Sequence, residues 1–179
     1  DIMSGQANEA VEVSLNSNNL KLLGIHSHIG SQIFEPDGFV HAINLLMSFL
    51  NGLKNDLGFT AEILNVGGGF GIRYTSEDEP LAVAKHIEKI TTIIKQQCEE
   101  LDYKLPELWL EPGRSIVGEA GTTLYTIGST KTLPSIRKYV SVDGGMTDNI
   151  RPALYGSKYE AMLANRANDE NKEVESIAG

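Results

Sequence analysis

Two polar clusters in the sequence carry side chains able to do chemistry. His26 and His28 are separated by one residue, so both imidazoles lie on one face of an extended segment. Glu111 begins the run Glu-Pro-Gly-Arg, which ends at Arg114. A carboxylate such as Glu111 can bind a protonated ring nitrogen, and an arginine fork suits a phosphate or a carboxylate. The alternative for this pair is an internal Glu111–Arg114 salt bridge.

A glycine run, Gly67-Gly68-Gly69-Phe70-Gly71, is the third cluster. Its backbone can take positive φ and bring N–H groups close to an anion, above all a phosphate. The dinucleotide fingerprint fails because Ile72 stands where its last glycine belongs, and a Walker lysine is missing. The run therefore predicts a site for one phosphate of a smaller cofactor, with a flexible turn as the alternative.

The histidines leave three interpretations open. His26 and His28 could begin a zinc site, but His41 and His86 do not easily supply the further ligands. We expect His41 to point away from the apolar stripe of its helix and His86 to lie at the edge of the next one. One imidazole could instead pack flat on an aromatic cofactor, or His26 could be a structural histidine inside a barrel.

Elements that could position these clusters precede each of them. Short apolar runs predict buried strands at residues 20–29, 62–66 and 108–110. Between them, two apolar stripes at helical spacing predict helices, carried by Phe39, Ile43, Leu46, Leu50, Leu53 and Leu57 and by Val83, Ile87, Ile90, Ile94 and Leu101. Gly58 is expected to end the first helix.

This alternation predicts an α/β fold with parallel strands joined by crossover helices. His28 to Gly67 spans 39 residues and Gly67 to Glu111 spans 44, slightly longer than the about 31 residues of an average βα-barrel unit. We therefore expect residues 1–117 to form part of a βα barrel whose site lies at the carboxyl ends of its strands.

After Val117 the helical period is lost. Residues 121–132 predict a long strand and residues 139–142 a shorter one, while 159–163 and 173–177 flank a polar turn at 168–172, a possible hairpin. Residues 118–179 are therefore expected to form part of a β-rich domain.

Composition narrows the function classes. A net charge of -9 argues against a nucleic-acid partner, and no apolar run approaches the about 20 residues of a membrane span. The single cysteine, Cys98, cannot form an internal disulfide, which indicates a reducing compartment and favours the cytoplasm. Cys98 lies on the second helical stripe, which predicts a buried thiol. Because the sequence opens on Asp1-Ile2 and stops at Gly179 just after a predicted strand, we expect it to be part of a longer protein.

Four motifs in this order carry a resemblance to a known family: His26-Ser27-His28-Ile29-Gly30-Ser31-Gln32, Gly67-Gly68-Gly69-Phe70-Gly71, Glu111-Pro112-Gly113-Arg114 and Asn149-Ile150-Arg151-Pro152-Ala153-Leu154-Tyr155. Over nearly its whole length the chain resembles the diaminopimelate decarboxylase family, pyridoxal-phosphate enzymes of the alanine-racemase-like barrel class. The resemblance implies a portion of a (β/α)8 barrel that binds pyridoxal 5'-phosphate, followed by part of a β-rich C-terminal domain.

The resemblance also implies roles for individual residues. His28 would stack on the pyridine ring, and Glu111 would contact and keep protonated the pyridine nitrogen, which favours decarboxylation over racemisation. The cofactor-binding set would be His28, Ser31, Gly67, Gly68, Gly69, Glu111, Pro112, Gly113 and Arg114. Arg114, Arg151 and Tyr155 would bind substrate.

Two residues that the family needs do not occur in this sequence. Its Schiff-base lysine lies on an early barrel strand, a context that none of Lys21, Lys54, Lys85 or Lys131 has. Its substrate-side cysteine would fall beyond residue 179. No catalytic residue is therefore assigned here, and this stretch alone is not expected to decarboxylate.

The activity implied by the resemblance is decarboxylation of meso-2,6-diaminopimelate to L-lysine and CO2 by a cytoplasmic enzyme, a homodimer at full length. A related decarboxylase of another or carrier-tethered amino acid is one alternative. A non-catalytic barrel that binds pyridoxal phosphate is another, although such a protein would lack the β-rich stretch.

Overall fold

The computed structural model describes residues 1–170 and 173–179, and the chain divides into two compact units. The first unit comprises residues 1–73 and 79–119, and the second comprises residues 74–78 and 120–179. None of the helices in the described ranges is long and apolar enough to cross a membrane.

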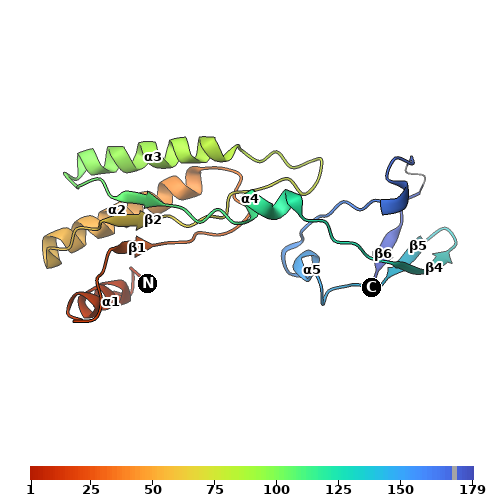
Figure 1. Cartoon of the computed structure of the whole chain (residues 1–179), viewed down its shortest axis with the longest axis horizontal. Coiled ribbons are helices and arrows are strands. Elements are labelled where there is room, and N and C mark those ends of the chain that lie inside the picture. The colour runs from red at the N-terminus through yellow and green to blue at the C-terminus, as the bar shows by residue number, and fades with distance from the viewer. Residues whose placement is uncertain (171–172) are drawn as a thin grey trace. The chain divides into compact units, whose positions relative to one another are not determined.

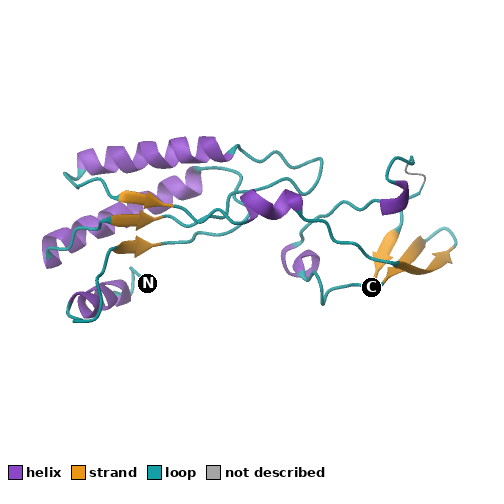
Figure 2. Cartoon of the chain, viewed as in Figure 1, coloured by secondary structure: helices purple, strands orange, loops and turns teal. Residues whose placement is uncertain are grey.

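The first unit is an α/β structure built on a three-stranded parallel sheet in the order β1-β2-β3 (Figure 1). Its elements are α1 (Gln6–Leu15), β1 (Gly24–His26), α2 (Asp37–Leu57), β2 (Ile63–Asn65), α3 (Val83–Glu100), β3 (Glu107–Trp109) and α4 (Arg114–Val117), followed by a 3-10 turn at Gly118–Ala120. Helices α2 and α3 are the two crossovers that parallel pairing requires (Figure 2). The predicted order of strands and helices is confirmed, although each strand is shorter than or shifted from its predicted range.

The core of this unit lies between the two crossover helices and one face of the sheet. Its buried side chains on the helices are Phe39, Ile43, Leu46, Met47, Leu50 and Leu53 from α2 and Ile90, Ile94 and Cys98 from α3. The predicted α2 stripe is confirmed, and the α3 stripe is confirmed from Ile87 onward, whereas Val83 at its start is exposed. Helix α2 ends at Gly58, whose φ of 66° is left-handed. Burial raises the pKa of the Cys98 thiol, as expected for an inert core cysteine.

Side chains along β2 alternate between the face of the sheet that packs on the core and the opposite face, which we call the site face. Leu64 and Val66 are buried in the helix-facing core, whereas Ile63 and Asn65 are only half-buried and point the other way. In register, His26 pairs with Asn65 and Asn65 with Trp109. The site face therefore carries one row of side chains across all three strand ends.

His86 corrects one prediction. It is fully buried, not at the edge of the helical stripe, and its ring contacts Phe39 at 5.9 Å and Phe70 at 5.3 Å between centroids. Phe70 belongs to the glycine run and covers the first turns of α3, a contact that helical spacing cannot reveal.

Helix α1 was not predicted. Only Val11 of this helix is buried, because its sequence carries no continuous apolar stripe, and such a stripe is the signal by which the other helices were predicted.

The second unit is β-rich. Strands β4 (Ile127–Leu133) and β5 (Arg137–Val142) form an antiparallel hairpin, and β6 (Ser176–Ala178) pairs parallel to β5. The only helices among its described residues are α5 (Arg151–Tyr155) and the 3-10 turn Ala164–Arg166.

Two strand predictions in this unit are wrong. Residues 121–126 are not a strand, so β4 begins later than expected, and residues 159–163 form no strand. The second half of the predicted hairpin, β6, instead adds to the edge of β5. Part of the predicted turn, residues 171–172, lies outside the described residues.

Candidate functional site

Backbone hydrogen bonds continue the sheet pairing beyond the strand ends and so bring three loops together. Glu111 N donates to Gly67 O at 2.8 Å, and Ile33 N donates to Gly69 O at 2.9 Å. Ile33 and Phe70 also form an isolated parallel bridge. The glycine run therefore lies between the loop that follows β1 and the loop that follows β3, at the carboxyl edge of a parallel sheet, where α/β folds build their sites.

The glycine run has no room for side chains. A Cβ on Gly68 would lie 1.9 Å from Glu111 O, and one on Gly69 would lie 2.0 Å from Gly30 O. Gly67 and Gly69 also have φ of 72° and 91°, in the left-handed region. The three loops therefore approach backbone to backbone, which explains why glycine occurs three times in succession.

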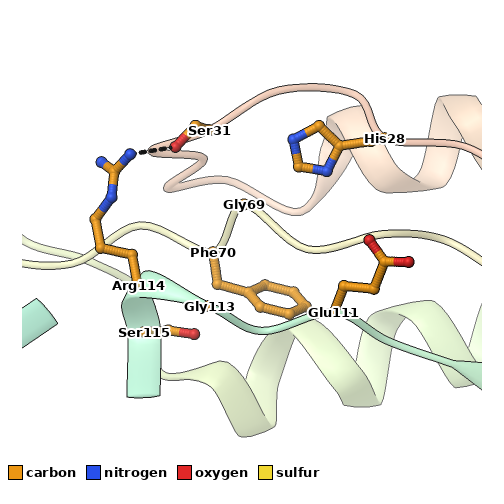
Figure 3. Close-up of a pocket in the computed structure, with 8 residues that line it drawn as sticks. All are labelled: His28, Ser31, Gly69, Phe70, Glu111, Gly113, Arg114 and Ser115. Carbon is orange, nitrogen blue, oxygen red and sulfur yellow. Dashed lines mark hydrogen bonds between the residues drawn. The ribbon is translucent and has the colours of Figure 1, made fainter. Parts of the chain in front are cut away.

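Eight residues from these loops line one pocket (Figure 3): His28, Ser31, Gly69, Phe70, Glu111, Gly113, Arg114 and Ser115. The structure thus brings together six of the predicted cofactor residues. Gly67, Gly68 and Pro112 lie in the same loops without lining the pocket. Phe70 and Ser115 line it but were not singled out in the sequence.

Arg114 is tied to the loop after β1. Its Nη2 donates to Ser31 Oγ at 2.7 Å, and its Nη1 donates to Gln32 Oε1 at 3.3 Å. Gln32 itself has a left-handed φ of 62°, and its amide exchanges hydrogen bonds with Ile72 N and O. A guanidinium beside a hydroxyl at the pocket wall provides donors for an anion.

Glu111 is held by the other two strand ends rather than by Arg114. Its Oε1 accepts a hydrogen bond from Asn65 Nδ2 at 2.8 Å, and its Oε2 lies 3.5 Å from His26 Nε2. The internal Glu111–Arg114 pair, the alternative raised by their spacing, does not occur among the described residues. The carboxylate faces the pocket that His28 also lines.

Asn65 was not among the predicted site residues. The signal was available, because Asn65 is the polar residue that ends the apolar strand directly before the glycine run. Its partner 46 residues later could not be read from spacing.

The other predicted substrate residues, Arg151 and Tyr155, lie in the second unit on α5. The Arg151 guanidinium carbon is 5.3 Å from the centroid of the Tyr155 ring. Within residues 1–170 and 173–179, no three His, Cys, Asp or Glu side chains group as metal ligands.

Comparisons with known proteins identify relatives of the chain. The family model "Pyridoxal-dependent decarboxylase, pyridoxal binding domain" matches residues 2–118. A diaminopimelate decarboxylase from Bacillus methanolicus is 52% identical over 179 residues, which are all of this chain and 41% of that protein. The diaminopimelate decarboxylase of Bacillus subtilis (strain 168) is 51% identical over the same length. The chain spans about two fifths of the length of these relatives.

Solved structures show the same likeness. Diaminopimelate decarboxylase from M. jannaschii in complex with L-lysine has 32% identity and a TM-score of 0.83, over 100% of this chain and 40% of that one. The Helicobacter pylori diaminopimelate decarboxylase complexed with L-lysine has 28% identity and a TM-score of 0.71, over 87% of this chain and 36% of that one. The predicted fold class, part of a pyridoxal-phosphate-binding barrel, is confirmed.

Proposed function

Because the chain belongs to the pyridoxal-dependent decarboxylase family, we propose that the complete protein containing it converts meso-2,6-diaminopimelate to L-lysine and CO2 with pyridoxal 5'-phosphate. The relatives that share about half of its residues are diaminopimelate decarboxylases, and two similar structures hold L-lysine, the product of this reaction. The observation that carries the proposal is the pocket in which His28, Glu111, Ser31 and Arg114 converge.

The donors and acceptors of this pocket fit the cofactor. The His28 imidazole offers a flat surface for an aromatic ring, and the Glu111 carboxylate can accept a hydrogen bond from a protonated ring nitrogen. Ser31 and Arg114 offer a hydroxyl and a guanidinium to a phosphate. No group in the described part of the chain accepts a hydrogen bond from the Gly69 amide, which therefore remains available to an anion.

When bound, the cofactor supplies an electron sink for the electron pair that the departing carboxylate leaves behind. Glu111 would hold the proton on the ring nitrogen, which would keep that sink deep. His28 would orient the ring by stacking on its face. Arg114 would neutralise part of the phosphate charge, and Arg114, Arg151 and Tyr155 are each proposed to bind substrate.

The test is Glu111→Gln in the complete protein. A neutral amide cannot hold the ring nitrogen protonated, so turnover per bound cofactor should fall about 100-fold or more, whereas cofactor affinity should change little. Glu107→Gln, at the start of β3 four residues before Glu111, is the matched control and should leave turnover unchanged. Normal turnover of Glu111→Gln with a lowered melting temperature would make Glu111 a structural residue.

The proposal extends to location and assembly. A single buried cysteine suits a reducing compartment, and we place the enzyme in the cytoplasm, as a homodimer. Sedimentation of the complete protein at micromolar concentration tests the assembly, and a monomer there would contradict it.

A further inference from the structure

Asn65 occupies a junction of the site without lining the pocket. It is the last residue of β2, in register with His26 on one side and Trp109 on the other. Its half-buried side chain lies on the site face of the sheet. Two of the three site loops meet at its amide group.

Both ends of that amide are used. Asn65 Nδ2 donates to Glu111 Oε1 at 2.8 Å, and Gly67 N donates to Asn65 Oδ1 at 2.9 Å. A carboxylate only accepts and a peptide N–H only donates, so the orientation of the amide is determined by its partners. Aspartate would keep the contact to Gly67 but lose the donor, and an apolar residue would lose both contacts.

The hydrogen bond from Asn65 leaves Oε2 of the Glu111 carboxylate available to a further donor. Oε1 is held by Asn65, while Oε2 has only the longer 3.5 Å approach of His26 Nε2. A carboxylate has about four lone-pair positions, so a further donor can still be accepted from the pocket. Because the donor is an uncharged amide, it fixes the carboxylate without neutralising it.

We propose that Asn65 is a positioning residue, which aims the Glu111 carboxylate at the cofactor ring nitrogen and fixes the first peptide of the glycine run. This inference rests on the proposed function. It links the group that binds the cofactor ring to the loop that binds its phosphate, through one side chain.

The test compares Asn65→Asp, Glu111→Gln and the double variant in the complete protein. Two carboxylates within about 3 Å repel each other, so Asn65→Asp turns Glu111 away from the ring nitrogen. Turnover per bound cofactor should fall about ten- to hundredfold, the worth of one hydrogen bond to a charged group. The absorption spectrum of bound pyridoxal phosphate should move in the same direction as in Glu111→Gln. Asn18→Asp, which adds the same charge in an exposed loop, should change neither quantity.

The double variant separates positioning from structural support. If Asn65 acts through Glu111, Asn65→Asp costs little further turnover once Glu111 is Gln, whereas an independent role gives additive losses and overturns the proposal. Asn65→Ala introduces no charge and carries the same test if Asn65→Asp lowers the melting temperature of the apoprotein.

Spectrum and turnover together distinguish failure of this inference from failure of the proposed function. A wild-type spectrum in Asn65→Asp, beside an altered one in Glu111→Gln, overturns the positioning role alone. If Glu111→Gln itself leaves both spectrum and turnover unchanged, the role of Glu111 at the ring nitrogen falls, and the role of Asn65 falls with it. A wild-type complete protein that does not convert meso-2,6-diaminopimelate to L-lysine would overturn the proposed function itself.

Discussion

Gly68→Ala provides the sharpest test of the backbone packing at the site. The added methyl carbon would lie 1.9 Å from Glu111 O and 2.7 Å from Glu111 C, both backbone atoms that no rotamer change can move. The loops after β2 and β3 must then separate by more than about 1 Å before the contact becomes tolerable. That movement breaks the neighbouring hydrogen bond from Glu111 N to Gly67 O, which is 2.8 Å long.

Two effects set the magnitude. Overpacking costs about 1–3 kcal/mol, and the lost hydrogen bond costs about 1 kcal/mol. We therefore expect Gly68→Ala to destabilise the protein by about 2–4 kcal/mol and to weaken cofactor binding, because Glu111 moves with its loop.

Gly52→Ala is the matched control. Gly52 lies within α2, and a Cβ there meets nothing within 4 Å. The same substitution should therefore stabilise the protein by about 0.5–1 kcal/mol through helix propensity. Thermal melting of both variants of the complete protein, with and without pyridoxal phosphate, measures the contrast. Equal melting temperatures for the two variants would refute the packing argument.

Two further predictions concern the core of the first unit. Burial lowers the pKa of His86, so below pH 6.5 the unfolded chain gains a proton that the folded chain resists. His86 should therefore lower the free energy of unfolding by up to about 1.4 kcal/mol for each pH unit of acidification. His86→Phe should remove that part of the pH dependence while exposed His41→Gln does not; identical pH profiles for wild type and His86→Phe would contradict this. Tyr103→Phe removes the hydroxyl that accepts the buried Ala61 N–H at 2.8 Å, so it should cost about 1–3 kcal/mol by chemical denaturation. Tyr125→Phe, at an exposed ring, should cost little, and an equal loss in both variants would contradict the role of the hydroxyl.

The sequence predicted those parts of the fold in which periodicity and burial coincide. The α2 stripe from Phe39 to Leu57 was readable because one face meets the core along the whole helix. Helix α1 was missed because it buries one side chain. In the second unit most strand residues are exposed, so the strand predicted at residues 159–163 had no packed face behind it and did not form.

The site could be predicted in part for a similar reason. Residues at the ends of parallel strands meet, so His28, Gly69 and Glu111 were expected together, and they line one pocket. The partners of each group could not be predicted. The amide of Asn65, rather than Arg114, holds Glu111, because strand register brings it there and sequence spacing does not record register.

The hydrogen bond between Arg114 and Ser31 joins residues 83 positions apart, and the bond between Asn65 and Glu111 joins residues 46 apart. Contacts of such separation form late in folding, because the intervening loops must close first. During synthesis, at about 5–20 residues per second, Arg114 leaves the ribosome roughly 4–17 s after Ser31. Through that interval the nascent chain has Ser31 and later the glycine run without their guanidinium. The groups proposed to bind the cofactor phosphate can therefore come together only after residue 114 has been synthesised.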